Sequence, residues 1–188
     1  YKNLYDPVTR QLRGKDSQGN WRTPFDPLVA TSPMNNPGDY TEANAWQYFW
    51  TPAQYDVKGI TELLGGKKQF TDQLDSFFSI KAINANKHLG QEAMIGQYAH
   101  GNEPSHHIAW LYAYSDTPEK GDRLISRICT EFYNNTPHGM IGNDDCGQMS
   151  AWFIFSSLGF YPVNPASCVF DIGVPAFKKA TIKIGNKS

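Results

Sequence analysis

The chain has 188 residues, enough for one ordinary domain with a sizeable core or for part of a larger domain. It carries 17 basic and 18 acidic side chains, which argues against a basic surface for nucleic acid and against an acidic tail. No apolar run approaches the roughly 20 residues that span a bilayer. The first residues also lack the charged and apolar regions of a signal peptide, so we expect a soluble chain.

Two residue classes narrow the interpretation only slightly. Aromatic residues make up 14% of the chain, which fits either a large core or a surface that stacks against sugar rings. The three cysteines, Cys129, Cys146 and Cys168, lie far apart without CxxC spacing, which argues against a disulfide framework or a zinc knuckle. They are either reduced thiols or one pair with a third left over.

The first forty residues are rich in Pro and Gly and predict hairpin or extended loop structure rather than a helix. A helix is predicted from Val57 to Leu64, because apolar residues recur there at helical spacing before Gly65 and Gly66, where a left-handed cap is available. A second helix follows at once, with one apolar face formed by Phe70, Leu74, Phe77 and Phe78. The very short connection predicts an antiparallel helix pair.

Three more helical segments are predicted further along the chain. The first runs from Ser105 to about Tyr114, and the second carries an apolar stripe from Leu124 to Phe132. A polar, Gly-rich loop then leads into a mostly buried helix over 148–158, which ends at Gly159. After residue 178 the period becomes two, because Ala180, Ile182 and Ile184 alternate with polar residues. This alternation predicts the start of a β region.

Helix pairs whose loops carry the unusual polar residues are typical of an α/α toroid, where loops at one end of the helix ring form the active site. Six or so helices are too few to close such a ring, so we interpret the chain as the C-terminal portion of a larger catalytic domain. The predicted fold is therefore mainly α, part of an α/α barrel, with the beginning of a β region at the C-terminus. Within it we expect a loop-rich lead-in over 1–40, helical hairpins over 41–160 and the β region over 161–188.

Three loop segments are distinctive: "EANAWQY" (42–48), "GNEPSHHIAWLY" (101–112) and "GNDDCGQMSAWFIFSSLGFYPVNPAS" (142–167). In sequence and in order they resemble signature segments of the glycoside hydrolase family 92 exo-α-mannosidases. The similarity covers roughly residues 39–185, while the first forty residues match only loosely.

The resemblance implies an inverting, calcium-dependent enzyme that removes mannose from the non-reducing end of α-mannosides. It also implies a β-sandwich domain followed by an α/α six-hairpin barrel, so that the missing N-terminal sandwich would be a partner of this chain. A periplasmic, secreted or cell-surface location and mannose-containing glycans as substrates follow from the same resemblance.

An inverting glycosidase needs a carboxylic acid for the leaving oxygen and a carboxylate for the attacking water, about 6.5 to 9.5 Å apart. Glu42 precedes Trp46 and Tyr48, aromatic groups that would exclude water and raise the pKa of a general acid. The alternative is that Glu42 caps a helix beginning near Ala43.

Asp145 is the predicted general base, in a Gly-flanked loop before a buried helix. Related enzymes often carry two acidic residues in this loop, separated by one position. Here the first of those positions is Asn143, which could orient water but could not accept its proton. Asp144 is a further catalytic candidate that would support the base from behind. Capping of the following helix is the alternative for both aspartates, and capping is compatible with catalysis.

Glu103 and Asn102 are the predicted calcium ligands, because a hard cation takes carboxylate and amide oxygens and would bind the 2- and 3-hydroxyls of mannose as well. Zinc is disfavoured, because neighbouring histidines on a helix point about 100° apart and no i, i+4 pair is present. Of His100, His106 and His107, we expect one to bind sugar hydroxyls and another to be structural.

The residues expected to bind substrate share the three loops: Trp46, Gln47, Asn102, His106, His107 and Asn143. The tryptophans Trp46, Trp110 and Trp152 are more often core residues than sugar platforms. Two other readings stay open: a different α/α-toroid carbohydrate enzyme of the glucosidase or trehalase type, and a non-catalytic glycan-binding fragment. Carboxylates on separate loops favour an enzyme.

Overall fold

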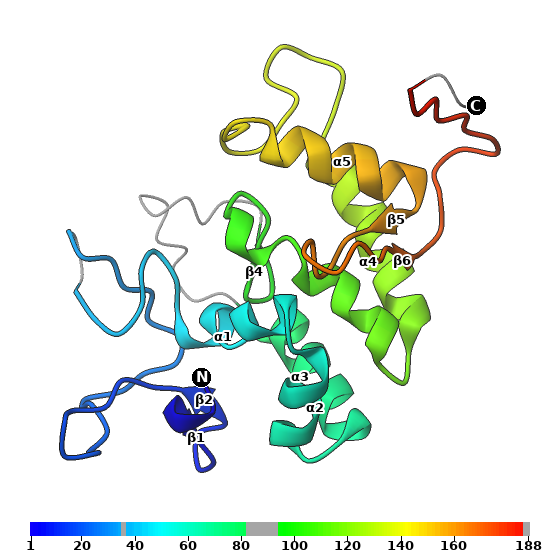
Figure 1. Ribbon diagram of the computed structural model, residues 1–188. Coiled ribbons are helices and arrows are strands. Elements are labelled where there is room, and N and C mark those ends of the chain that lie inside the picture. The colour runs from blue at the N-terminus through cyan, green and yellow to red at the C-terminus, as the bar shows by residue number, and fades with distance from the viewer. Residues whose placement is uncertain (35–36, 82–93, 186–188) are drawn as a thin grey trace.

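The computed structural model describes residues 1–34, 37–81 and 94–185, and this part of the chain is mainly helical (Figure 1). Its α-helices are α1 (Ala45–Tyr48), α2 (Val57–Leu64), α3 (Lys67–Ser79), α4 (Pro118–Glu131) and α5 (Gln148–Leu158). Its 3-10 helices are η1 (Lys2–Leu4), η2 (Thr51–Gln54), η4 (Glu103–Ser105) and η5 (Ile108–Tyr114). Among these residues, no helix combines the length and the apolar character needed to cross a bilayer.

The described strands are short and pair as antiparallel ladders of two. They are β1 (Tyr5–Asp6) with β2 (Gln11–Leu12), β3 (Met94–Ile95) with β4 (Tyr98–Ala99), and β5 (Phe160–Tyr161) with β6 (Asp171–Ile172). The first ladder agrees with the hairpin or extended loop structure predicted for the lead-in, although the short 3-10 helix η1 precedes it. Its turn is closed by a buried ion pair in which Arg13 Nη1 lies 2.6 Å from Asp6 Oδ2.

Helices α2 and α3 form the predicted pair, joined by Gly65 and Gly66. Asp56 caps α2 by accepting a hydrogen bond from the Gly59 amide at 2.8 Å, and Gly65 ends it with a φ of 100°. Glycine adopts this left-handed conformation at little energetic cost because it has no Cβ, which explains why α2 ends sharply here. In Figure 1 the two helices lie side by side below α1, and they contact each other.

The main core is aromatic and is centred on Trp50, which follows α1 and is fully buried. Phe49, Phe70 and Phe77 surround its indole, and the Trp50 and Phe70 ring centroids lie 5.5 Å apart in an edge-to-face arrangement. Edge-to-face pairs are favourable because the positive ring edge meets the negative ring face. Trp110 and Trp152 are also buried, so their assignment to the core is confirmed.

The segment predicted as a helix over Ser105 to Tyr114 forms two 3-10 helices instead, η4 and η5. Residues 108–112 are all buried, with α4 and α3 packed against them, so tertiary contacts rather than helix propensity determine this backbone. Gly121 on α4 permits the close approach, because a Cβ at that position would lie 2.7 Å from the Cβ of Tyr112.

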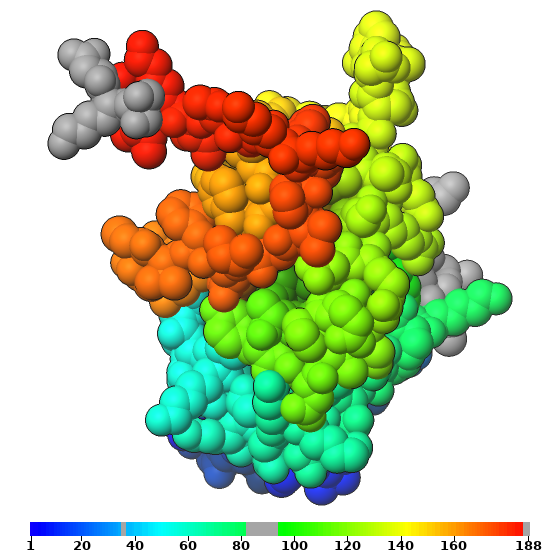
Figure 2. Space-filling model, turned by 90° about the vertical axis from the view of Figure 1, so that its right-hand side faces the viewer, coloured from blue at the N-terminus to red at the C-terminus, as the bar shows by residue number. Residues whose placement is uncertain are grey.

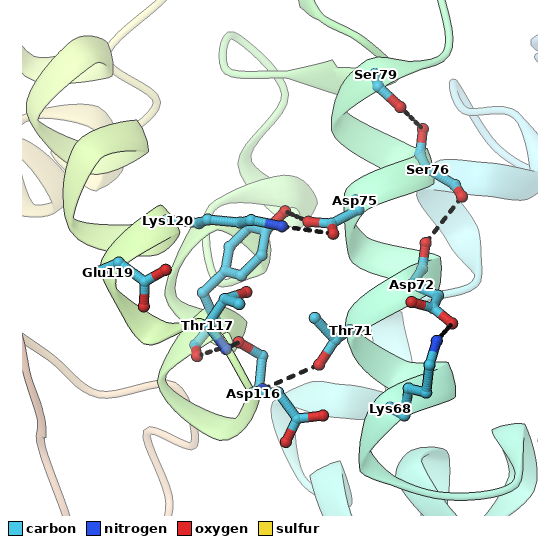
Figure 3. A network of polar contacts seen from close by, with 12 residues as sticks. Lys68, Thr71, Asp72, Asp75, Ser76, Ser79, Asp116, Thr117, Glu119 and Lys120 are labelled. Carbon is cyan, nitrogen blue, oxygen red and sulfur yellow. Dashed lines mark hydrogen bonds and ion pairs between the residues drawn. The ribbon is translucent and has the colours of Figure 1, made fainter.

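A polar network joins α3 to α4 across the end of η5 (Figure 3). The Asp75 carboxylate accepts hydrogen bonds from the Tyr112 hydroxyl at 2.9 Å and from Lys120 Nζ at 2.6 Å. The Asp116 amide donates to the Thr71 hydroxyl at 3.0 Å. These contacts fix α4 against α3, and α4 in turn supports α5.

Helix α5 is largely apolar on all sides and ends at Gly159, whose φ is 82°. Its described neighbours leave part of it uncovered, since Ile154 is 56% exposed. Apolar side chains that follow it are exposed as well: Val169, Phe170, Ile172, Val174, Phe177, Ile182 and Ile184. In Figure 2 the C-terminal residues, in red, extend from the body of the molecule.

The prediction of a strand around Ala180 to Ile184 is wrong. Residues 180–183 pair with no described strand, and Ile184 alone takes part in a β bridge. Strand pairing occurs earlier instead, between β5 and β6. A period of two supplies an apolar face but no pairing partner, which is why the pattern misled. Cys129, Cys146 and Cys168 are all free thiols. The closed barrel needs more helices than the described residues contain and stays a prediction.

Candidate active site

The three distinctive loops each place a carboxylate at the start of a helix. Glu42 precedes α1, Glu103 opens η4, and Asp145 precedes α5.

The backbone next to Glu42 is held by a buried amide network. Asn44 is the N-cap of α1, and Asn44 and Gln47 form a reciprocal capping box, with each side chain bonded to the other's backbone amide at 3.0 Å. Asn44 Nδ2 also donates to Gln97 Oε1 at 2.8 Å, and Gln47 Nε2 donates to the Gln97 carbonyl at 3.1 Å. The network ties the Glu42 segment to the β3–β4 hairpin, and Asn44 rather than Glu42 is the cap.

Glu42 itself is exposed and has a φ of 52°. Its carbonyl accepts a hydrogen bond from Asn102 Nδ2 at 3.2 Å, so the first and second loops touch. Trp46 is half-buried against the main core, and the Tyr48 ring lies 5.1 Å from the Tyr40 ring. Within the described chain, these aromatic rings do not bury Glu42.

The second and third loops meet at Glu103 and Asp145. Burial raises the pKa of Glu103, and the adjacent Asp145 carboxylate, within hydrogen-bonding reach, raises it further. Gly142 and Gly101 bring the two backbones together, because a Cβ at Gly142 would lie 3.4 Å from Gly101 Cα. The structure therefore gathers Glu42, Asn102, Glu103 and Asp145 through successive contacts.

Asp144 supports the third loop from the helix side. Its Oδ1 accepts hydrogen bonds from the Ser150 amide at 3.0 Å and from the Ser150 hydroxyl at 2.7 Å, so it caps the first turn of α5. Neither aspartate is the N-cap residue of α5, which is Gly147, but Asp144 satisfies an amide of the first turn from outside the helix, while the Asp145 side chain turns to Glu103. Asn143 is exposed at the tip of the same loop.

The adjacent histidines His106 and His107 are both buried and bond to protein atoms. His106 Nε2 donates to the His100 carbonyl at 3.0 Å, and His107 Nε2 donates to the Trp50 carbonyl at 2.8 Å. Since a carbonyl only accepts, each ring is protonated at Nε2. Burial lowers the pKa of each to about 4, which keeps both neutral near pH 7.

The whole chain, residues 1–188, matches the model of the glycosyl hydrolase family 92 catalytic domain. It belongs to glycoside hydrolase family 92.

Solved structures agree with this family 92 assignment. An α-mannosidase of the family from Bacteroides thetaiotaomicron, in complex with mannoimidazole, is 44% identical, with a TM-score of 0.85 over 93% of this chain and 23% of that chain. An inverting mannosidase of family 92 from the same organism is 35% identical, with a TM-score of 0.74 over 95% of this chain and 24% of that one.

A curated relative, an uncharacterised secreted glycosidase of Arthroderma benhamiae, is 28% identical over 165 residues, which is 84% of this chain and 19% of the relative. The family 92 chain thus spans about a quarter or less of the proteins it matches.

A metal site is only partly supplied by the family 92 residues described here. No group of three or more His, Cys, Asp or Glu side chains suited to a metal ion occurs among them. Glu103 and Asp145 nevertheless form a close carboxylate pair with Asn102 beside it, and their mutual repulsion is what a cation would relieve. Because calcium takes 6 to 8 oxygen ligands, this donor set fits part of a calcium shell.

Backbone strain marks two of the loops. Glu42 and Asp145 both have positive φ, 52° and 41°, a region that residues other than glycine seldom adopt. Cys146 and Gly147 continue it after Asp145, with φ of 59° and 93°. Strained backbone of this kind gathers at functional sites, where the surrounding structure imposes it.

Sequence reasoning missed the polar residues that support the site. Tyr98 and Tyr133 hydroxyls each lie 2.7 Å from a ring nitrogen of buried His100, and the Tyr133 hydroxyl reaches the Met149 carbonyl at 3.2 Å. Burial lowers the pKa of His100 to about 3. Gln97 and Gln148 were missed too. His100 lies within the quoted loop, but only the fold shows which partners its ring nitrogens have.

Proposed function

We propose that the full-length protein is an inverting exo-α-mannosidase in which this chain supplies the general acid, Glu42, and the general base, Asp145. The proposal rests mainly on the convergence of the three loops, through the Asn102 to Glu42 hydrogen bond and the Glu103 and Asp145 pair. The identity of 44% to an α-mannosidase solved with mannoimidazole supports the choice of sugar.

In the proposed reaction, Glu42 donates its proton to the glycosidic oxygen as the bond from that oxygen to C1 breaks. Asp145 takes a proton from a water whose oxygen attacks C1 from the opposite face, which inverts the anomeric centre. Asp144 keeps the Asp145 loop in place through Ser150. Asn143, exposed beside it, would orient the water but cannot accept its proton.

We propose that Glu103 and Asn102 hold Ca²⁺, with further ligands from waters and from the sugar. When bound, the ion would supply positive charge at the 2- and 3-hydroxyls and help flatten the ring toward its oxocarbenium-like transition state. Glu103 must be deprotonated to bind it, so the raised pKa of the free carboxyl makes binding sensitive to acid.

Among the residues predicted to bind substrate, Asn102, Asn143 and Trp46 retain exposed surface, and we assign sugar contacts to them. Gln47, His106 and His107 are buried, and we assign them the role of supporting the loops through hydrogen bonds. The remaining enclosure of Glu42 would come from the rest of the catalytic region, including the proposed N-terminal β-sandwich. Action on mannose-containing glycans outside the cytoplasm fits the secreted relative.

The test is to follow hydrolysis of an aryl α-mannoside by the full-length protein with NMR, before and after EDTA. We expect β-mannose as the first product, loss of activity on chelation and recovery with Ca²⁺. The matching aryl α-glucoside is the control and should be left intact. Initial α-mannose, cleavage of the glucoside, or indifference to EDTA would contradict inversion, sugar choice or the metal, respectively.

A further inference from the structure

The Glu103 and Asp145 loops are connected by a second contact, three residues after each carboxylate. Gln148 Nε2 lies 3.2 Å from His106 Nδ1. Backbone hydrogen bonds join each partner to its carboxylate residue: the His106 amide donates to the Glu103 carbonyl at 3.0 Å, and the Gln148 amide donates to the Asp145 carbonyl at 3.2 Å. The Glu103 and Asp145 contact and the His106 and Gln148 contact therefore join the same two short segments.

The direction of the side-chain contact follows from the tautomer of His106. Because its Nε2 donates to the His100 carbonyl, Nδ1 carries a lone pair and accepts from Gln148. The histidine therefore cannot turn to a sugar hydroxyl without losing both partners.

The other surroundings make His106 a rigid support. Its ring stacks on His100 with centroids 4.9 Å apart, and its carbonyl accepts from Trp152 Nε1 of α5 at 3.0 Å. Gln148 lies in the first turn of α5, and its amide also lies within reach of the Tyr161 hydroxyl. A fixed imidazole thus holds the start of α5, the element that carries Asp145.

We infer that His106 and Gln148 are positioning residues: their hydrogen bond sets the placement of Asp145 relative to Glu103. The inference deepens the proposed function and rests on it for its catalytic meaning. Neither residue touches substrate in this scheme. Their effect on rate passes through Asp145, because a base displaced by about 1 Å can cost 10²-fold.

The test compares Gln148→Leu with Gln69→Leu in the full-length protein. Both glutamines are exposed, lie in the first turn of an α-helix after a glycine N-cap, and lose the same amide. We expect Gln148→Leu to lower kcat about 10-fold or more with KM nearly unchanged, while Gln69→Leu alters neither. Melting temperatures should stay close to wild type for both.

His106→Gln completes a double-mutant cycle, because the glutamine amide can still donate to the His100 carbonyl, while its own acceptor oxygen does not lie at the position of Nδ1. If the pair acts as one unit, the double variant is no slower than the slower single variant. Effects on kcat that multiply in the double variant would overturn the inference.

Hydrogen exchange gives a readout that does not need activity. Amides over 142–150 should exchange faster in Gln148→Leu and in His106→Gln, and at the wild-type rate in Gln69→Leu. Wild-type exchange in Gln148→Leu would overturn the inference even in an active enzyme. An inactive wild-type protein would instead contradict the proposed function, and the exchange data would still decide the role of the pair.

Discussion

The two candidate catalytic carboxylates are held in different ways. The segment that carries Glu42 is supported by buried side-chain amides. Asn44, Gln47 and Gln97 are each at most 4% exposed and form hydrogen bonds with one another. The Asp145 side is an exposed loop, fixed by Asp144 to Ser150 and by Gln148 to His106. The backbone that follows Glu42 is anchored in the core by this network, while the Asp145 loop is attached at two points.

The difference suggests how such a site divides its tasks. A proton donor needs a constant orientation toward the leaving oxygen, which a buried network provides. The base must accommodate a water and, in our proposal, a neighbouring metal ligand, and an open loop leaves room for both. Apart from the carboxylates themselves, substitutions in the buried network beside Glu42 should therefore cost more stability than substitutions in the Asp145 loop.

The largest expected effect separates the chemical jobs of the two carboxylates. Glu42→Gln should slow hydrolysis of mannobiose by about 10² to 10⁴-fold, because the departing sugar must be protonated, and should slow an activated aryl mannoside far less. Asp145→Asn should slow both, because water must be deprotonated in either case. Kinetics of both variants on both substrates, with melting curves, check this. Near-normal rates for Asp145→Asn would remove it as the base and direct attention to Asp144.

Low pH should destabilise the structure around both Glu42 and Asp145, because buried neutral histidines support the segments that carry them. His107 bonds the Trp50 carbonyl after α1, and His100 and His106 lie behind the base loop. Their folded pKa values, about 3, 4 and 4, lie below the ordinary 6.5, so the unfolded chain binds more protons below pH 6.5.

The stabilisation is complete above that pH and is lost as the pH falls toward 4, at about 1.4 kcal/mol per pH unit for each ring and about 4 for all three. Urea titrations of the full-length protein between pH 7 and 5 measure how the free energy of unfolding changes with pH. His107→Gln should reduce this slope by the contribution of one histidine. A flat profile would contradict three neutral buried rings.

Next in size is the contrast between the two helix caps. Asn44→Ala removes the α1 cap and leaves buried Gln97 Oε1 without its donor, which should cost about 2 to 3 kcal/mol. Asp144→Ala removes an exposed cap of α5 and should cost about 1 kcal/mol. Chemical denaturation of both variants tests the ranking. Equal losses would mean that the acid side is no more deeply anchored than the base side.

The smallest effect concerns strain at the base. Asp145→Gly relieves a φ of 41° and should stabilise the protein slightly, by at most about 1 kcal/mol, while abolishing hydrolysis. Asp16→Gly is a suitable control, because this exposed aspartate is not among the residues with positive φ and accepts three hydrogen bonds from its own turn. It should destabilise. A loss of stability in Asp145→Gly would show that the loop is not strained there.

Helices with a clean period and a cap were predictable from the sequence, and those with neither were not. Val57 to Leu64 carries an apolar stripe and ends in Gly65, and the structure reproduces both limits. Residues 108–112 of η5 are all buried, so no apolar stripe separates a buried face from an exposed one, and tertiary packing produces a 3-10 backbone. The alternation near Ile182 has no partner strand among the residues that the structure describes.

For the candidate site, the sequence indicated which loops contribute to it but not which role each of their residues has. Glu42, Glu103 and Asp145 were identifiable as carboxylates in polar loops, and the fold brings their loops together. The roles of Asn44, His106 and Gln148 depend on which hydrogen bond each side chain makes across 3 to 53 residues of chain. Such pairings are set by the fold, and residue type alone does not reveal them.

The uncovered apolar face of α5 and the exposed apolar residues after it have a practical consequence for biochemistry. Ile154, Phe170 and Ile172 are 56%, 45% and 77% exposed, and apolar surface of this extent promotes self-association in water. We expect the chain expressed by itself to form concentration-dependent aggregates in light scattering. Solubility tags or detergents would mask that tendency without restoring a native surface, so work in solution is better done on the intact polypeptide.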